Sequence, residues 1–404
     1  MPIHKDNNQK NWYLISVVSI SVAMLFGYFL TYVGFAKRRG FKGDFFAAMY
    51  DPNWWDGQGI LYGPIFVIER WVVNFFPSLM TVEIFAIGCI LLILLSLFFA
   101  SKVAQFEKKS LLFCFSVWTF NTYFYYAFSV AANPELIELF FLIFMWWSFS
   151  QNRLTLGWIA FSCAVLTKLA PVILFPILLI FFSWPGLLAS ASIVAIAMIV
   201  VSIGQNQSVL ASISQLLDVK SEILHPESEQ FLGLGSAVAR FLGVLPGQDL
   251  FQIHLFTTIT VSIMFCLATV MAVRVSKSDF NLRIKSNYIF AVFMCLLPIA
   301  HLNQTHRHTF IFLAPVFIAM HFLLLNGDVA TITNKYRLIL NLLFVGYSLV
   351  PIYFLDVFPV RNLVGSSFGS DFYVSLILLS EPIWTNLAIF VFVLMYGHRV
   401  LLKK

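Results

Sequence analysis

Long apolar runs separated by short polar segments recur along the chain from Trp12 to Val400. A helix needs about 18 to 20 apolar residues to cross a hydrocarbon core of roughly 30 Å, and several runs reach that length. Charged residues gather in the connections. The pattern therefore predicts an all-α fold, a polytopic transmembrane helical bundle of about 12 spans. The expected spans are residues 12–35, 81–100, 111–131, 136–149, 154–167, 171–184, 187–204, 253–274, 288–300, 310–325, 338–355 and 376–400.

The composition agrees with a membrane protein. Hydrophobic residues make up 60% of the 404 positions and charged residues 11%, whereas a soluble domain has roughly 25% charged residues. Such a chain has too little polar surface for a water-soluble globule. The first apolar run is too long for the core of a signal peptide and lacks a small-residue cleavage site, so it is expected to be a retained span.

The distribution of Lys and Arg predicts the orientation. Thr167, Lys168 and Pro171 interrupt the apolar stretch 154–184, which crosses either once or twice. Two crossings place the basic loop RVSKSDFNLRIK (274–285) and the C-terminal RVLLKK (399–404) on one side. That side then holds 15 of the 25 Lys and Arg residues but only 4 of the 19 acids, which favours the cytoplasm for both termini. The net charge of +6 thus reflects orientation, not nucleic-acid binding.

The chain is expected to form a single membrane domain, 1–404, with three long segments on its outer face: 36–80, 205–252 and 356–375. No internal repeat or soluble domain is visible, so function is expected on this face. One basic cluster, Lys37, Arg38, Arg39 and Lys42, breaks the charge pattern because it follows the first span on the outside. Either the topology is inverted there or these cations bind an anionic ligand.

The first outer segment combines acids, aromatics and bases in a short stretch. Its carboxylates are Asp44, Asp51, Asp56 and Glu69. One interpretation is an interfacial aromatic belt with solvated charges; four carboxylates favour a site instead. Asp44 lies beside the basic cluster and precedes Phe45-Phe46. A carboxylate held against apolar groups is suited to act as a general base toward an alcohol, and the cations are suited to hold a phosphate leaving group.

Several short motifs in this order resemble a known family of membrane enzymes. Asp44-Phe45 follows the first span, and Tyr62-Gly63-Pro64 opens the next helix. Residues 132–136 (ANPEL) resemble an Asn-containing outer loop, and residues 166–171 (LTKLAP) resemble a Lys-x-x-Pro break in the middle of the bundle. Together these motifs resemble the GT-C membrane glycosyltransferases, especially glycosyltransferase family 87, the polyprenyl-phosphate-mannose-dependent mannosyltransferases. The motifs cover the first half of the chain, and the second half is similar in topology.

The resemblance implies an inverting glycosyltransferase that moves a sugar, in this family mannose, from a polyprenyl-phosphate donor to a lipid or glycan acceptor. Asp44 is then the catalytic base, and one base suffices because direct displacement inverts the anomeric carbon. The pocket is expected between the membrane and the outer aqueous phase, in a bacterial plasma (inner) membrane with the periplasm outside. The expected acceptor and sugar contacts are Asp56, Gln58, Tyr62, Glu69, Asn133 and Glu135.

The expected donor-phosphate ligands are cations at the outer ends of spans. Lys168 stands in an otherwise apolar stretch, where an ionisable group costs about 2.5 to 3.5 kcal/mol. It binds phosphate, pairs structurally, or snorkels to the interface. His306 and Arg307 belong to a His/Arg cluster between two spans, which is either a phosphate or sugar contact or a plain polar turn. Arg38 and Arg39 complete the set.

No metal or other cofactor is expected, because no metal-ligand spacing is visible and the five cysteines all lie inside apolar runs. The expected partners are the polyprenyl-phosphate sugar, the acceptor and the membrane, with no nucleic acid. Two alternatives remain. A transporter or flippase of lipid-linked sugars requires ionisable residues deep within several spans. A polysaccharide polymerase requires an arginine-rich large outer loop, whereas 205–252 holds only Lys220 and Arg240.

Overall fold

A computed structural model describes residues 82–104, 123, 135–168, 170–181, 184–204, 206–211, 233–242, 251–300, 307–326, 330–354 and 381–402. Within these ranges the chain is helical and contains no strand, so the all-α prediction is confirmed for this part of the protein. The expected span 12–35, and the expected span 111–131 apart from Tyr123, lie outside the described residues. The prediction of about twelve spans therefore stays a prediction.

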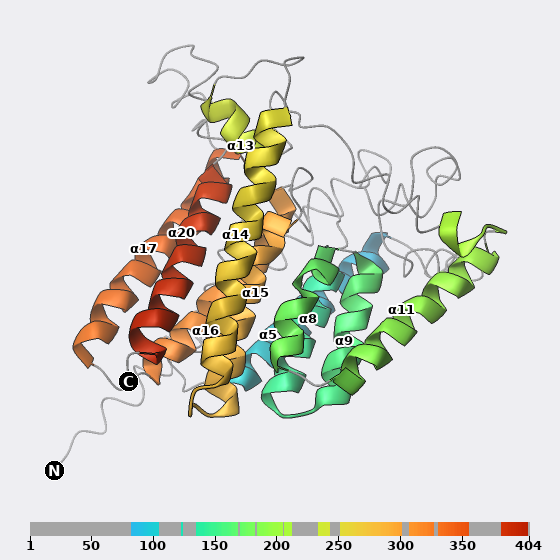
Figure 1. The fold of residues 1–404 in the computed structure, drawn as a ribbon, viewed down its shortest axis with the longest axis horizontal. Helices are drawn as coiled ribbons and strands as arrows, with labels where there is room; N and C mark the ends of the chain where they lie inside the picture. Colours follow the sequence, from blue (N-terminus) through green and yellow to red (C-terminus); the bar gives the residue numbers. More distant parts are fainter. Residues whose placement is uncertain are drawn as a thin grey trace.

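The helices follow the apolar runs closely. In chain order they are α5 (Val82–Ala104), α8 (Glu135–Ser150), α9 (Leu154–Thr167), η3 (Ala170–Leu174), α10 (Phe175–Phe181), α11 (Trp184–Gly204), α13 (Leu234–Phe241), α14 (Phe251–Ser276), α15 (Leu282–Ala300), η6 (Arg307–Leu313), α16 (Ala314–Leu325), α17 (Ala330–Phe354), α20 (Glu381–Tyr396) and the π-helical turn η7 (Gly397–Leu401). Figure 1 shows α17 and α20 on one side, α14 and α15 in the middle, and α8, α9 and α11 on the other side.

Three of the described helices are long and apolar enough to cross a membrane, over Trp184–Gly204, Leu255–Ser276 and Leu282–Ile299. Shorter apolar helices cover Ile87–Val103, Leu154–Thr167, Ala170–Ile180 and Thr309–Leu325. These helices support membrane character.

The centre of the bundle is built on α15 and α16. In the stretch of α15 that is long enough to cross a membrane, 78% of the residues are buried, against 22% in α11 and 28% in α14. Trp146 of α8 stacks on Phe290 of α15 with ring centroids 4.2 Å apart. The Tyr347 hydroxyl donates to the Phe310 carbonyl and the Tyr396 hydroxyl donates to the Leu323 carbonyl. A helix that is apolar all round is suited to this central place, because every face meets another helix.

Two contacts settle how often the chain passes through the bundle between residues 154 and 184. The Ser162 and Ser190 hydroxyls lie 2.7 Å apart, and Gly186 lies against the indole of Trp158. The paired positions increase together, so α9 and α11 run parallel. The segment η3–α10 must therefore return along the bundle between them. Lys168 starts this reversal with an extended backbone at φ −153°, ψ 137°. Pro171 follows in η3, and because proline has no backbone N–H, α9 could not continue through it without losing a hydrogen bond. Residues 154–184 thus pass through the bundle twice, whereas the number of membrane crossings stays a prediction.

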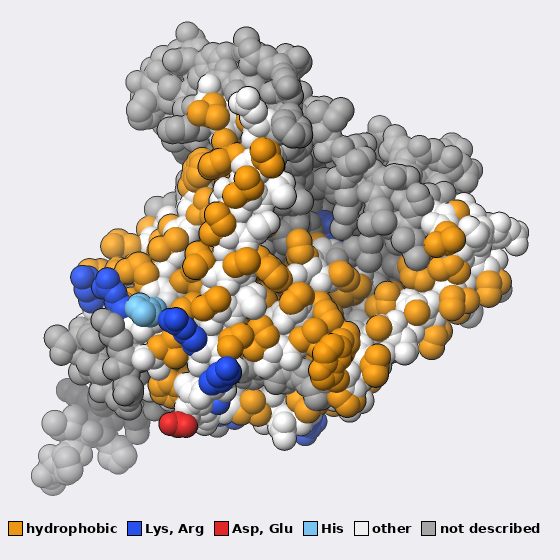
Figure 2. Space-filling model, in the orientation of Figure 1, with side chains coloured by type: hydrophobic (Ala, Val, Ile, Leu, Met, Phe, Trp, Pro, Cys, Tyr) orange, Lys and Arg blue, Asp and Glu red, His pale blue; other side chains and the backbone are white. Residues whose placement is uncertain are grey.

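Basic residues gather at one end of the bundle, which we call the basic end. The turn between α14 and α15 meets the C-terminal segment there, because η7 contacts α14 and Gly397 lies against Tyr288. The basic loop and residues 399–402 thus lie at the same end of the bundle, and their common side of the membrane stays a prediction. The basic residues at this end are Lys102, Arg153, Arg274, Lys277, Arg283, Lys285, Lys335, Arg337 and Arg399, and the one acid among its described residues is Asp279. Figure 2 shows blue side chains along this lower edge and hydrophobic ones over the middle.

Candidate functional site

The end opposite the basic end is the acidic end, where α8 begins and α9 finishes. Of the predicted site residues, the structure describes the side chains of Lys168 and Glu135, and it describes Arg307 as the first residue of η6. The other predicted site residues lie outside the described residues: Asp44, Arg38, Arg39, His306, Asp56, Gln58, Tyr62, Glu69 and Asn133. Their roles stay predictions.

Helices α8 and α9 form an antiparallel hairpin that brings the acidic-end residues together. The turn between them contains Asn152 in the left-handed region at φ 59°, a conformation that Asn tolerates. Phe149 meets Trp158 edge to face near this turn, with ring centroids 5.8 Å apart. The far ends of the two helices, Glu135 and Lys168, therefore meet at the acidic end.

Lys168 forms an ion pair with Glu135, with its ammonium donating to Oε1 of the carboxylate. The Glu135 side chain is fully buried and that of Lys168 is 15% exposed. Glu135 is also the first residue of α8, where the helix dipole favours a negative charge. A buried pair is held together strongly because losing one partner leaves an uncompensated charge, at a cost of about 3 to 5 kcal/mol. The structure thus favours pairing over snorkelling for Lys168.

Glu138 adds a second buried carboxylate one turn into α8. Residues three apart lie on the same helix face, so both carboxylates and the Lys168 ammonium share one region of the acidic end. We call Glu135, Glu138 and Lys168 the charged cluster. Sequence reasoning singled out Glu135 and Lys168 but missed Glu138. The available signal was a second acid, three residues after the first, inside an apolar helix.

The segment that begins at Arg307 lies at the same end. Helix η6 follows the acidic-end terminus of α15, and it contacts α8, α15 and α16. Within η6, Thr309 is buried and Phe310 packs on Tyr123, with ring centroids 5.7 Å apart. The backbone of η6 is therefore fixed by buried aromatic contacts. The bundle brings the start of η6 to the end that holds the charged cluster, although about 140 residues separate Arg307 from Lys168 in the chain.

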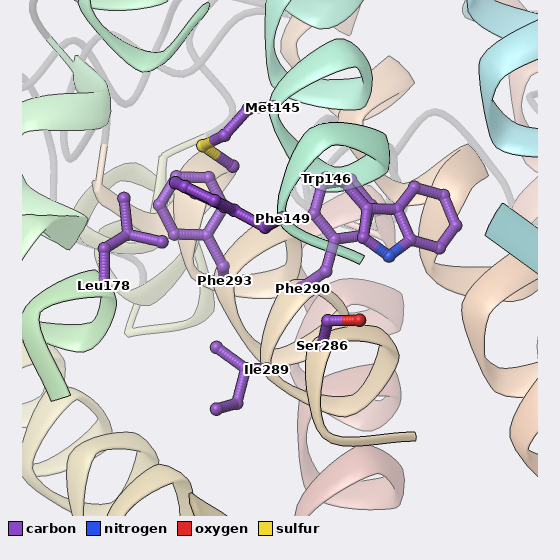
Figure 3. Close-up of a pocket in the computed structure, with 8 residues that line it drawn as sticks. All are labelled: Met145, Trp146, Phe149, Leu178, Ser286, Ile289, Phe290 and Phe293. Carbon is purple, nitrogen blue, oxygen red and sulfur yellow. The ribbon is translucent and has the colours of Figure 1, made fainter. Parts of the chain in front are cut away.

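A small cavity lies beside the stacked rings of Trp146 and Phe290 (Figure 3). Its lining comes from α8, α10 and α15, and includes Trp146, Leu178, Ser286 and Phe293. Its volume is about 20 Å³, which is room for about one water molecule. The Ser286 hydroxyl donates to the Arg283 carbonyl. The cavity is too small and too apolar for a sugar. Among the described residues, the charged cluster is the candidate site because it brings together Glu135 and Lys168, two of the predicted site residues.

Within the described ranges no three His, Cys, Asp or Glu residues group in a way that suits a metal ion. Cys163, Cys266 and Cys295 are free thiols. The comparisons with known proteins add no family: no family model matches the chain, and no curated protein matches it at a significant level.

Proposed function

We propose that the protein is an inverting, polyprenyl-phosphate-sugar-dependent glycosyltransferase that passes a sugar, mannose in the first instance, to a lipid or glycan acceptor at the outer membrane face. The observation that supports this most is the charged cluster at one end of an apolar bundle. Ionisable groups buried within a membrane bundle are costly, and a functional site is their default interpretation. The sequence motifs around Asp44, Glu135 and Lys168 supply the class of reaction.

In the proposed reaction Asp44 accepts the proton of the acceptor hydroxyl as that oxygen attacks the anomeric carbon. The bond between the anomeric carbon and the phosphate oxygen breaks, and its electron pair leaves with the polyprenyl phosphate. Attack from the opposite side inverts the anomeric configuration. The leaving phosphate gains negative charge, so cations held near it stabilise the transition state. The proposed cations are Lys168, Arg307, Arg38 and Arg39, with His306 as a further hydrogen-bond donor.

The pairing of Lys168 with Glu135 is compatible with this role. An ammonium group carries three N–H donors, and the bond to Glu135 uses one of them. The partial exposure of Lys168 leaves one side of the group open to a ligand. Glu135 then orients Lys168 toward the proposed donor phosphate.

The proposed orientation follows from the charges at the two ends. The basic end carries the described Lys and Arg clusters, and the positive-inside rule assigns such an end to the cytoplasm. The acidic end, with the charged cluster, then faces the periplasm of a bacterial plasma membrane. Polyprenyl-phosphate sugars presented in that leaflet would reach the cluster from the membrane.

A transporter of lipid-linked sugars is a second candidate, and the same cluster favours it. Buried acid and base pairs in membrane bundles also serve as substrate or proton sites in transporters. The two functions differ in outcome. A transferase releases free polyprenyl phosphate and a glycosylated acceptor, whereas a transporter moves the lipid-linked sugar intact across the bilayer.

The test is purification of the full-length protein with native lipid, followed by mass spectrometry of co-purified polyprenyl phosphates and an assay of sugar transfer from the bound donor. We expect a polyprenyl-phosphate sugar to co-purify and Asp44→Asn to retain it without turnover, because Asn keeps the shape and loses the base. Activity of Asp44→Asn within a few-fold of wild type would remove Asp44 as the base. Movement of intact donor across proteoliposomes, without transfer, would favour the transporter.

A further inference from the structure

Helix α14 has one face that packs on the bundle and one face that does not. Met264, Ala268, Met271, Ala272 and Val275 are buried on the inner face. On the other face, exposed side chains follow at helical spacing from Leu255 to Arg274. Figures 1 and 2 show this face at the front of the molecule, with hydrophobic side chains over its middle.

A groove runs along this exposed face. Its lining comes from α14 and includes Thr258, Ser262, Ile263, Cys266, Leu267 and Val270. All of its described lining residues belong to this one helix, so the groove is a shallow, open strip along the helix surface. The Ser262 hydroxyl donates to the Thr258 carbonyl, so it does not require a ligand hydrogen bond. The small side chains at 258, 262 and 266 make the groove, and the larger Ile263 and Leu267 form its wall.

The groove ends at cations. Arg274 lies one heptad after Leu267 and so follows the groove along the same face of α14, and Lys277 comes directly after the last residue of this helix. Both side chains are exposed. Helix η7 contacts α14 and adds the exposed Arg399. Asp279 is the acidic side chain nearby in the chain, and the positive charge at this end exceeds it.

We propose that α14 carries a binding site for an anionic two-chain phospholipid, with one acyl chain in the groove and the phosphate on Arg274, Lys277 and Arg399. The apolar groove is suited to a hydrocarbon chain, because it offers few hydrogen-bond partners to a polar ligand. The cations at its end match a phosphate at the depth of the headgroups, since basic residues at membrane interfaces attract anionic lipids. The site lies at the basic end, away from the charged cluster, and does not depend on sugar transfer.

The test is native mass spectrometry of the delipidated full-length protein with phosphatidylglycerol or with phosphatidylcholine of the same chains. We expect at least about tenfold preference for phosphatidylglycerol. The double variant Arg274→Gln/Lys277→Gln should weaken its binding about thirtyfold, because each basic residue contributes about fivefold. The matched control Lys102→Gln/Arg153→Gln removes the same charge at the same end from other helices and should change binding by less than about threefold.

A third variant tests the groove itself. Ser262→Phe fills the groove without changing the charge, and it should weaken binding of the long-chain lipid while leaving the weak binding of glycerol phosphate unchanged. Circular dichroism of each variant confirms folding. Equal losses in the two double variants, no preference between the lipids, or full binding by Ser262→Phe would each overturn the proposal.

Discussion

Lys168 donates a hydrogen bond to Glu135 across 33 residues of sequence, and the pair fixes the end of α9 against the start of α8. Its importance depends on burial. An exposed ion pair contributes about 0 to 1 kcal/mol, whereas in this pair the Glu135 side chain is fully buried and the Lys168 side chain is 15% exposed. The pair is therefore expected to affect both folding and the proposed site, and the two effects are separable by experiment.

Lys168→Met is expected to destabilise the protein by about 3 to 5 kcal/mol, because it leaves the buried Glu135 carboxylate without the ammonium. The double variant Lys168→Met/Glu135→Leu should recover most of this loss, since two apolar groups pack without charge. Thermal unfolding in detergent measures both, with Lys102→Met, at an exposed position, as the control. Equal destabilisation by the single and double variants would contradict a dominant role for the ion pair.

Donor affinity gives the second prediction. Lys168→Ala and Arg307→Ala should each raise the apparent KM for the polyprenyl-phosphate sugar by about tenfold or more, because a hydrogen bond to a charged group contributes about 1.5 to 3 kcal/mol. Arg307→Lys should recover only part, because the bidentate fork is lost. The measurement uses protein shown to be folded. Unchanged donor kinetics in both alanine variants would assign the phosphate to Arg38, Arg39 or their neighbours.

The parallel packing of α9 and α11 depends on Gly186. A Cβ at this position would come within 1.8 Å of the Trp158 indole nitrogen. Gly186→Ala should therefore lower the free energy of unfolding by about 1 to 3 kcal/mol, the usual cost of overpacking, and lower the Tm accordingly. Gly88→Ala is the matched control, because nothing lies within 4 Å of its Cβ position in α5. Trp158→Phe should relieve part of the Gly186→Ala effect. A Tm loss in the control as large as in Gly186→Ala would contradict the steric explanation.

Cysteine labelling tests the orientation. In a cysteine-free background, single cysteines at Gln151, Ser278 and His398 should resist an impermeant thiol reagent added outside, because all three lie at the basic end. Cysteines at Gln58, Ser228 and Ser367 should react. After the cells are opened, the cysteines at positions 151, 278 and 398 should react with the reagent, which shows that they are accessible to it from the other side. Labelling of position 278 in intact cells would invert the proposed orientation.

Chelation tests the prediction that transfer needs no metal. Activity should survive EDTA, because Lys and Arg suffice to stabilise a monophosphate leaving group. The assay compares chelated protein with protein resupplied with Mg²⁺ or Mn²⁺. Loss of activity on chelation and recovery on resupply would make some of the outer-segment carboxylates metal ligands.

The positions of the helices could be predicted from the sequence because a helix depends on local properties. The apolar run 154–167 became α9 with the same bounds, and 187–204 differs from α11 only at its start. Errors occurred where charges extend a helix beyond its apolar part. Helix α15 starts at Leu282, six residues before the predicted 288, and its first turns hold Arg283 and Lys285. The Lys285 ammonium donates to the Ser276 carbonyl at the end of α14. This hydrogen bond spans the turn between α14 and α15, so the charged residue belongs to the helix and not to the connection.

Composition and the apolar runs thus determined the helical fold of the described residues and their membrane character, and the charge asymmetry predicted that the basic loop and the C-terminal residues lie together. Only the tertiary structure decided that α9 and α11 run parallel, that Lys168 pairs with Glu135, and that Glu138 and the start of η6 lie at the same end. The reason is physical: an apolar run shows that a helix is buried in a hydrocarbon medium, but it does not show which other helix it packs against. The neighbour depends on side-chain shape and on hydrogen bonds between residues far apart in the sequence, such as Ser162 with Ser190.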